Sequence, residues 1–201
     1  MPNWLIDLIE QHSTIVLFRH VFPDMDALGS QLGFSLWLKN RYPQKQIYCL
    51  GQNNSLSDKL GFQMDEVTED VLKDSLGIIL DTSNASRVDD QRFTLCKQTC
   101  RIDHHVQVES FCDQEWIDDH ASATCEMLAL YFDHIQASLP KQSAQLIYEG
   151  LIADNIRFTI STVREQTYDA AKYLYSQGVD VIEAERVNFN SSLLDYQYET
   201  L

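Results

Sequence analysis

Basic residues are scarce in this chain. Lysine and arginine together number 15 against 30 aspartates and glutamates, which gives a formal net charge of -15 at pH 7. A protein that binds long nucleic acid needs a basic surface, because contacts with phosphates supply much of the binding free energy. The composition therefore argues against stable binding of long nucleic acid. A small phosphorylated substrate remains compatible with it, because bound divalent cations can invert the local field.

Long apolar runs, flexible linkers and an even set of cysteines are also missing. No run of about 18 apolar residues is present to span a membrane, and residues 1–10 lack the basic start and long apolar core of a signal peptide. The five cysteines indicate free thiols, and no second pair joins Cys96 and Cys100 to make a structural zinc site. We therefore expect a cytoplasmic protein without a membrane anchor.

Short apolar runs alternate with segments of helical periodicity. The runs are rich in isoleucine, valine and leucine, which is typical of buried parallel strands, and lie at 14–18, 47–50, 77–80 and 99–102. Helices are expected at 4–11, 27–39, 121–132, 142–152, 164–176 and 181–190. This alternation predicts an α/β fold with a mostly parallel sheet flanked by helices.

Polar residues follow the first predicted strand. Ligands in such sheets bind beyond the carboxyl ends of the strands, and His20, Asp24 and Asp26 lie there. An imidazole and two carboxylates in one loop can bind a divalent cation, and Pro23 makes that loop rigid. Because Asp24 and Asp26 are two residues apart, each can face a different metal. The alternative is an acidic loop in which Asp26 caps the next helix.

Two further predicted strands also end in polar residues. Asp81 directly follows the third apolar run, where a carboxylate is costly unless it is paired, hydrogen-bonded or bound to metal. A turn or a helix cap is the alternative role for Asp81. The fourth strand ends in Asp103, His104 and His105, and adjacent histidines are unusual in a chain with only 6 histidines. His120, which follows two aspartates, is left open as an additional ligand.

The combined motifs resemble those of the DHH phosphoesterases in order and spacing. They are HVFPDMDALGS at 20–30, LDTS at 80–83, DHH at 103–105 and GLIADNIRF at 150–158. That superfamily includes RecJ-like exonucleases, manganese-dependent inorganic pyrophosphatases, exopolyphosphatases and cyclic-dinucleotide phosphodiesterases. The chain is most similar to the bacterial oligoribonuclease (nanoRNase)/pAp phosphatase branch, through DTSNASRVDDQRF at 81–93, SATCEML at 122–128 and LIYEGLIAD at 146–154.

The resemblance implies an enzyme with two Mn²⁺ ions, with Mg²⁺ or Co²⁺ as alternatives. In the matching positions, His20 and Asp24 bind one metal, and Asp81 is shared by both. The ligands of the second metal are Asp26, His104 and Asp154. This mixture of imidazole and carboxylate ligands suits Mn²⁺. Two ions of this kind can activate water and stabilise charge on a phosphoryl group.

The resemblance also implies roles for three residues outside the ligand set. His105 matches a residue that contacts the substrate phosphate, and Asp103 matches a carboxylate that orients the neighbouring histidine. Asp103, like Asp81 and His105, is thus counted among the catalytic residues. Arg87 is a candidate contact to the phosphate, although a surface pairing with Asp89 or Asp90 is the favoured alternative.

The implied reaction is hydrolysis of short oligoribonucleotides or of 3′-phosphoadenosine 5′-phosphate. The alternatives are an inorganic pyrophosphatase, an exopolyphosphatase, a cyclic-dinucleotide phosphodiesterase or a non-catalytic metal-binding domain. The expected partners are a short RNA or nucleotide phosphate, with no membrane and with a homodimer as one expected form.

The chain departs from the family pattern in two places. Relatives carry Thr-Gly after the last acidic ligand, whereas this chain has Asn155 and Ile156. A glycine there suggests special backbone geometry, so these two residues put the substrate choice in doubt. In addition, the Gly-Gly-Gly-His motif of a second domain does not occur. We therefore expect a catalytic domain at 1–190 and, at 191–201, the start of a linker to a C-terminal substrate-binding domain absent from this chain. Catalysis by the single domain is expected to be weak, because its site is open on one side.

Overall fold

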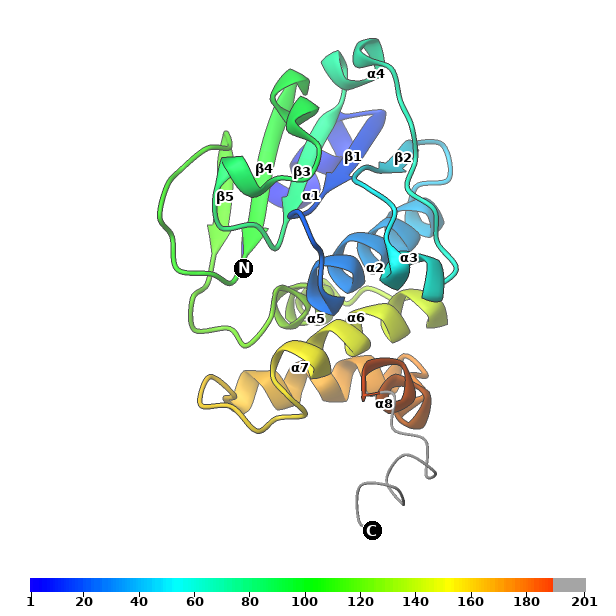
Figure 1. Ribbon diagram of the computed structural model, residues 1–201, viewed down its shortest axis with the longest axis vertical. Coiled ribbons are helices and arrows are strands. Elements are labelled where there is room, and N and C mark those ends of the chain that lie inside the picture. Colours follow the sequence, from blue (N-terminus) through cyan, green and yellow to red (C-terminus); the bar gives the residue numbers. More distant parts are fainter. Residues whose placement is uncertain (190–201) are drawn as a thin grey trace.

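The computed structural model describes residues 1–189, and these residues form a five-stranded sheet with helices on both faces (Figure 1). The strands are β1 (Thr14–Phe18), β2 (Gln46–Cys49), β3 (Leu76–Leu80), β4 (Gln98–Asp103) and β5 (Gln114–Ile117). The helices before the last strand are α1 (Trp4–Gln11), α2 (Met25–Arg41), α3 (Ser55–Lys59) and α4 (Glu69–Lys73), with the 3-10 turns η1 (Ala85–Arg87) and η2 (Gln91–Leu95). The helices after it are α5 (Thr124–His134), α6 (Lys141–Asp154), α7 (Glu165–Ser176) and α8 (Val181–Phe189).

All five strands are parallel, in the order β2-β1-β3-β4-β5. The predicted α/β fold with a parallel sheet is therefore confirmed. The chain moves from β1 to one neighbour, β2, and then crosses back to β3 on the other side of β1. The sheet thus has a topological switch point between β1 and β3. Ligands of open α/β sheets bind at such a point, beyond the carboxyl ends of the strands.

The edge strand β5 was not predicted from the sequence. Its residues, QEWI, are half-buried or exposed and do not form a continuous apolar run. They pair with β4 along one side only, with Ile102 opposite Trp116. An edge strand of this kind buries too little surface to need the continuous apolar run by which a central strand is predicted.

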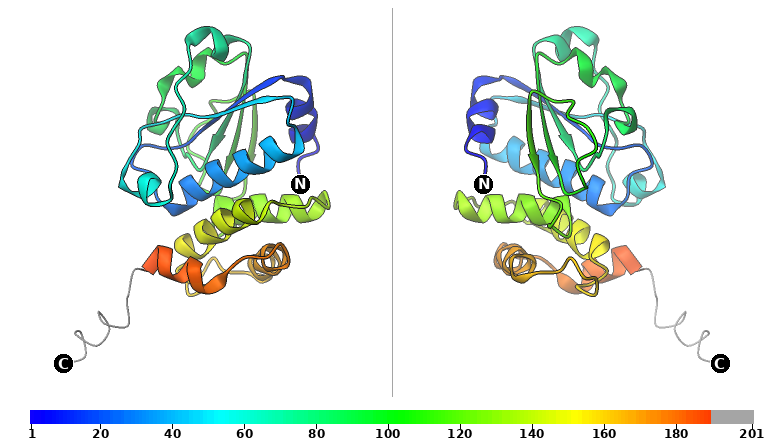
Figure 2. Two further views of the ribbon diagram at one scale, coloured as in Figure 1. Left: turned by 90° about the vertical axis from the view of Figure 1, so that its right-hand side faces the viewer. Right: turned by 90° about the vertical axis from the view of Figure 1, so that its left-hand side faces the viewer.

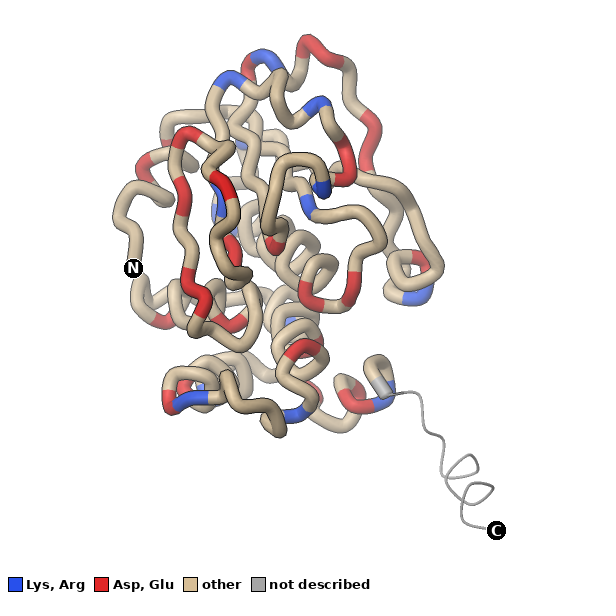
Figure 3. Tube along the Cα trace, turned by 60° about the vertical axis from the view of Figure 1, so that its left-hand side comes forward, with Lys and Arg blue, Asp and Glu red and all other residues tan. Residues whose placement is uncertain are grey.

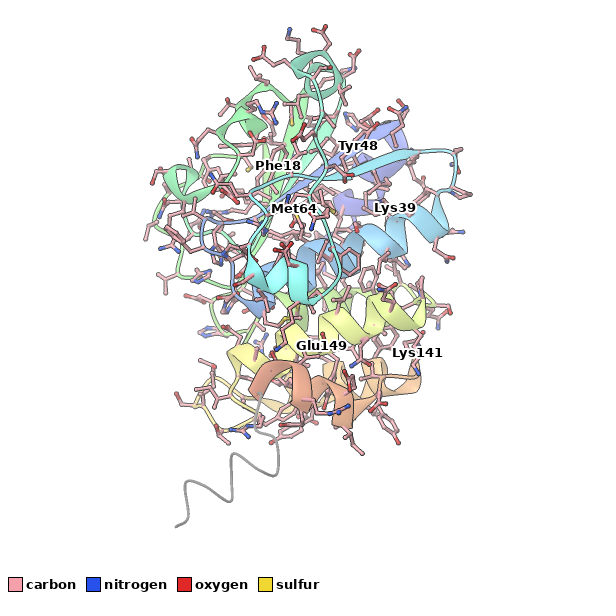
Figure 4. All side chains as sticks on the ribbon, turned by 45° about the vertical axis from the view of Figure 1, so that its right-hand side comes forward. Phe18, Lys39, Tyr48, Met64, Lys141 and Glu149 are labelled. Carbon is pink, nitrogen blue, oxygen red and sulfur yellow. The ribbon has the colours of Figure 1, made fainter. Side chains whose placement is uncertain are left out.

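Alternate residues of the strands pack on opposite faces of the sheet. Ile15 and Leu17 belong to the larger core, which also includes apolar residues of α1, α2, α5 and α6. Val16 and Phe18 face a smaller core that is closed by residues of α4 and η2. Phe18 and Tyr48, labelled in Figure 4, lie on this second side of the sheet. Because successive side chains of a strand point to opposite faces, the single apolar run of β1 contributes residues to both cores.

Helix α2 lies between the sheet and α6, with α7 and α8 beyond them (Figure 2). Glycines allow α2 and α6 to approach closely. A Cβ atom on Gly29 would lie 2.5 Å from the Leu146 carbonyl oxygen of α6, and one on Gly150 would lie 2.9 Å from the Met25 carbonyl oxygen of α2. No side chain fits at these positions, so the backbones meet directly. This contact sets the position of the end of α6 relative to the start of α2.

Most predicted helices are present with small shifts of their ends. The largest shift concerns α5, which was expected from 121 and begins at Thr124. No helix among residues 1–189 is long and apolar enough to cross a membrane. The linker expected at 191–201 lies outside the described residues.

Candidate functional site

Three loops and one helix end meet at the switch point of the sheet. The loops follow β1, β3 and β4, and the helix end is the last turn of α6. Together with the first turn of α2, which carries Asp26, they hold all six residues that the sequence suggested as metal ligands. The surplus of acidic residues is spread over the chain, with few basic positions among them (Figure 3). The site is distinguished by histidines and carboxylates that converge, rather than by acidity alone.

The first group of side chains consists of His20, Asp24 and Asp81, whose potential ligand atoms all lie within 4.8 Å of one another. The Nε2 atom of His20 is 3.4 Å from Asp81 Oδ2 and 3.8 Å from Asp24 Oδ2. The other ring nitrogen, Nδ1, donates a hydrogen bond to the Val21 carbonyl at 2.7 Å. That bond fixes the orientation of the ring and leaves Nε2 free to bind a metal.

The second group consists of Asp26, His104 and Asp154, whose ligand atoms meet the same distance limit. The Nε2 atom of His104 is 3.3 Å from Asp154 Oδ2 and 3.8 Å from Asp26 Oδ2. Its Nδ1 atom donates to the Ala121 carbonyl at 3.3 Å. Both histidines therefore direct the same nitrogen into the site while a backbone carbonyl holds the other.

Asp81 lies between the two groups. It is 1% exposed, and its Oδ1 atom is 3.5 Å from His104 Nε2, while Oδ2 faces His20. Burial alone would raise the pKa of Asp81, but the hydrogen bond from His20 and the charges of His104 and His105 lower it overall. Its backbone has a φ of 51°, a left-handed conformation that is unusual for aspartate. Asp81 is thus a buried carboxylate with an imidazole on each side.

Asp26 is equally buried and is held by the start of α5. Its two oxygens accept the backbone N–H groups of Thr124 at 2.7 Å and Cys125 at 2.9 Å. These bonds satisfy two of the unpaired donors at a helix N-terminus, which explains why α5 begins at Thr124. The suggestion that Asp26 caps its own helix α2 is wrong. Asp24 performs that role, because its Oδ1 accepts the Ala27 N–H at 3.0 Å.

The carboxylates of the second group repel one another. Burial, together with the charges of Asp81 and Asp154, raises the pKa of Asp26 well above its usual value. Burial raises the pKa of Asp154 to about 6; the charges of Asp81 and Asp24 add to that rise, and His104 opposes it. Converging carboxylates of this kind are stabilised by a cation between them. Their oxygens, together with imidazole nitrogens, form a donor set that fits divalent metals such as Mn²⁺.

The DHH motif contributes one more pair. His105 Nδ1 lies 2.7 Å from Asp103 Oδ1, and this hydrogen bond is the main cause that raises the pKa of His105 to about 9. The same nitrogen is 3.6 Å from Asp81 Oδ1, and the ring is 44% exposed. Asp81, His104 and His105 also form a third group with potential ligand atoms within 4.8 Å. Asp103 orients His105 at the open side of the site, while its second oxygen, Oδ2, is buried and has no hydrogen-bond partner among residues 1–189.

The favoured pairing of Arg87 is wrong. Asp89 pairs with Arg19 at 2.6 Å, and Asp90 pairs with Arg92 at 2.7 Å. Both carboxylates are therefore occupied, and Arg87 is exposed with no side-chain partner among residues 1–189. The Arg87 carbonyl accepts the N–H of Val21 at 2.8 Å, which holds η1 against the loop after β1.

Two candidates lie apart from the ligand groups. The side chain of His120 is 84% exposed beside Asp119, and none of the three groups formed by the described residues includes it. Ile156 has a φ of 47°, followed by positive values at Arg157 and Phe158. The geometry that a glycine would favour is therefore present, although an isoleucine occupies it. Asn155 supports this turn, since its Oδ1 accepts the Phe158 N–H at 2.9 Å.

Thr124 is a site residue that the sequence reasoning missed. Its hydroxyl donates to Asp81 Oδ1 at 3.1 Å, and its backbone N–H binds Asp26. It therefore contacts one carboxylate from each ligand group. Thr124 lies within the stretch SATCEML, but a lone threonine gives no sign of a contact so distant in the chain.

Known proteins are similar in sequence to much of this chain. The DHH family, N-terminal domain, matches residues 14–151. The chain is 35% identical over 193 residues to an uncharacterised protein of Mycoplasma genitalium, covering 94% of this chain and 60% of that protein. It is 36% identical over 170 residues to the bifunctional oligoribonuclease and PAP phosphatase NrnA of Bacillus subtilis, covering 83% of this chain and 54% of that enzyme. The chain thus spans 54% to 60% of the length of these curated relatives.

Solved structures share the fold. An exopolyphosphatase-related protein from Bacteroides fragilis superposes with a TM-score of 0.82 at 22% identity, covering 94% of this chain and 60% of that one. The exonuclease RecJ bound to manganese superposes with a TM-score of 0.55 at 14% identity, covering 92% and 53%. These likenesses concern the fold alone. The match of the family over residues 14–151 shows that the chain belongs to the DHH family.

Proposed function

We propose that this chain carries the catalytic centre of a metal-dependent phosphoesterase. The observation that carries the proposal is the position of Asp81 between two groups of ligand atoms. One group adds His20 and Asp24, and the other adds Asp26, His104 and Asp154. A carboxylate shared in this way suits two metal ions held close together.

The proposed ions are two Mn²⁺, with Mg²⁺ or Co²⁺ as alternatives. Mixed imidazole and carboxylate ligands favour Mn²⁺, and the distant structural neighbour RecJ was solved with manganese. Bound divalent ions would lower the pKa of an attacking water and place positive charge beside the phosphoryl oxygens. The protein's part is to keep Nε2 of His20 and His104 directed inward and to hold Asp81 and Asp26 in place through hydrogen bonds.

His105 is proposed to contact the substrate phosphate. The hydrogen bond to Asp103 raises the pKa of His105 to about 9, which favours the protonated ring, and a protonated ring can donate a hydrogen bond to an anion. Asp103 positions the ring. Arg87 is a second proposed phosphate contact, because its usual acidic neighbours are already paired and its backbone is bonded to the loop after β1.

The proposed substrates are short oligoribonucleotides and 3′-phosphoadenosine 5′-phosphate. This choice follows the relatives from Bacillus subtilis and Streptococcus mutans, at 36% and 33% identity, which are named for these activities. A cyclic-di-AMP phosphodiesterase of Geobacillus thermodenitrificans is more distant, at 25% identity. We propose residues 1–190 as the catalytic domain, acting in the cytoplasm, with dimerisation as a further expectation.

Hydrolysis of a dinucleotide and of adenosine bisphosphate with Mn²⁺ tests the proposal. The chain is compared with its Asp81→Ala variant, with and without chelator, and circular dichroism checks that both are folded. We expect cleavage that the chelator and the substitution each abolish. Cleavage of pyrophosphate alone would favour the pyrophosphatase alternative. Tight binding of Mn²⁺ without any hydrolysis, even with a second domain restored, would favour a non-catalytic metal-binding domain.

A further inference from the structure

Phe22 is the most exposed large apolar residue among the described residues, and it lies between two proposed ligands. Its exposure is 93%, and its φ of 52° is in the left-handed region. Exposing an aromatic ring and holding an L-residue in this conformation both cost free energy. Backbone strain of this kind collects at functional sites. Because Cα atoms are about 3.8 Å apart along the chain, Phe22 lies within about 8 Å of both His20 and Asp24.

The loop around Phe22 is anchored on both sides. Val21 donates its N–H to the Arg87 carbonyl at 2.8 Å. The backbone of His20 forms an isolated antiparallel β-bridge with that of Val88. On the other side, the ring of Pro23 restricts the backbone, and Asp24 is bonded to the first turn of α2. The ring of Phe22 is thus displayed from a fixed loop.

Phe22 forms one wall of a groove of about 270 Å³. The opposite wall is the segment after β2, with Gln52, Asn53 and Asn54. Pockets for drug-sized ligands usually exceed about 300 Å³, so this groove suits a single ring system rather than a whole nucleotide. It adjoins the ligand groups through Pro23 and Asp24.

Two amide groups on the opposite wall have a defined orientation. Asn53 Oδ1 accepts the N–H of Met64, which is labelled in Figure 4, at 2.8 Å. Asn54 Oδ1 accepts the N–H groups of Leu56 and Ser57. Because only the oxygen of an amide can accept these bonds, the NH₂ group of each side chain is left as a donor. Neither NH₂ group has a partner among residues 1–189, and each can bind an acceptor on a ligand.

The charge of the groove is nearly balanced. Its one carboxylate, Asp89, is paired with Arg19 at 2.6 Å and accepts the Gln52 N–H at 2.8 Å. The groove therefore offers an aromatic face and amide donors rather than a net charge. A flat, neutral ring with acceptor atoms on its edge matches all of these features, and a nucleobase is such a ring.

We propose that this groove binds the nucleobase of the substrate, with Phe22 stacked on its face and the amides of Asn53 and Asn54 donating to its edge. The inference rests on the proposed function, which brings the phosphate of the same nucleotide to the adjacent ligand groups. It assigns Phe22 to substrate recognition rather than to the chemistry. Stacking of a base on an aromatic ring tolerates different bases, so Phe22 contributes affinity for nucleotides without selecting one base.

Binding of AMP and of ribose 5-phosphate, measured by calorimetry with Mn²⁺ present, tests the proposal. Phe22→Ala should weaken AMP binding by about 10-fold, since stacking is worth about 1–3 kcal/mol per base. Its binding of ribose 5-phosphate should not change, because that ligand lacks the base. Phe22→Tyr keeps an aromatic ring and should bind AMP about as tightly as wild type. Tyr175→Ala removes an aromatic ring that is 66% exposed on α7 and serves as the matched control.

Equal affinity of wild type and Phe22→Ala for AMP would overturn the proposal, as would failure of wild type to bind AMP more tightly than ribose 5-phosphate. Equal weakening of both ligands would also overturn it, because Phe22 would then act through the metal loop. Kinetics with a dinucleotide separate this result from the proposed function. If wild type cleaves it and Phe22→Ala has an unchanged KM, the base site is wrong while the phosphoesterase stands. If wild type cleaves nothing, even with a second domain restored, the phosphoesterase is wrong.

Discussion

The Nε2 atom of His104 lies 3.3 Å from the Oδ2 atom of Asp154, although one residue follows β4 and the other ends α6. This contact depends on the packing of α6 against α2. The start of α2 carries Asp26, and the two helices approach closely at Gly29 and Gly150. Gly29 and Gly150 thus allow the helix packing that brings the residues of the second ligand group together.

Gly29→Ala should therefore disturb both stability and metal binding. Its Cβ would lie 2.5 Å from a backbone oxygen of α6, which cannot move aside as a flexible side chain can. We expect a loss of about 1–3 kcal/mol in the free energy of unfolding. Chemical denaturation measures the first effect and titration with Mn²⁺ the second. Lys172→Ala, at an exposed position of α7, is the control and should leave both unchanged.

His105→Ala should reduce turnover more than it reduces metal occupancy. The ring is held by Asp103 at 2.7 Å on the open side of the site, where a phosphate can reach it. Asp103→Asn should give a milder loss of turnover and should lower the pKa of His105. Turnover and bound metal are measured on the same samples. An equal loss of metal and turnover in His105→Ala would identify His105 as a ligand.

Thr124→Ala should weaken metal binding or turnover by about 10-fold to 100-fold, the range typical of residues that orient a ligand. The variant loses the hydroxyl that donates to Asp81 at 3.1 Å but keeps the backbone bond to Asp26. Thr124→Ser retains the hydroxyl and should stay close to wild type. Equal activity of the alanine and serine variants would show that the hydroxyl has no role.

Stabilisation by Mn²⁺ should increase with pH. The pKa of Asp154 is raised from 3.8 to about 6 by burial and by the neighbouring carboxylates. Because the carboxyl pKa is raised, Asp154 in the metal-free folded state keeps its proton to a higher pH than in the unfolded chain. The contribution of Asp154 to the free energy of unfolding therefore declines as pH rises from about 4 to 6. Metal binding must displace this proton, so affinity grows over the same interval. The rise in Tm on adding Mn²⁺ should be larger at pH 7.5 than at pH 5. A constant rise would contradict the prediction.

Ile156→Gly should leave stability unchanged or raise it. A β-branched residue at a φ of 47° costs about 1–2 kcal/mol, whereas glycine adopts this conformation freely. The flexibility of glycine in the unfolded chain offsets about 0.5–1 kcal/mol of that gain. Thermal unfolding gives the measurement. Ile182→Gly changes an exposed isoleucine in α8 and should lower Tm, because glycine disfavours an ordinary helix.

The sequence by itself determined the central strands and the positions of the polar residues that follow them. Runs such as 14–18 and 77–80 are buried on both faces, so nearly all of their residues are apolar and the pattern is plain. Parallel strands end at the same edge of a sheet, which is why residues from separate loops were expected to meet there. The left-handed turn at Ile156 was also foreseeable, from the glycine that relatives carry at that position.

Only the tertiary structure decided which polar groups pair with each other. Asp24 rather than Asp26 caps α2, Asp26 instead caps α5, and Asp89 takes Arg19 rather than Arg87. A carboxylate accepts whichever donors packing brings within about 3 Å, and sequence separation does not limit that choice. The role of Thr124 and the half-exposed strand β5 escaped notice for the same reason. Their contacts arise from neighbours that are adjacent only after the chain has folded.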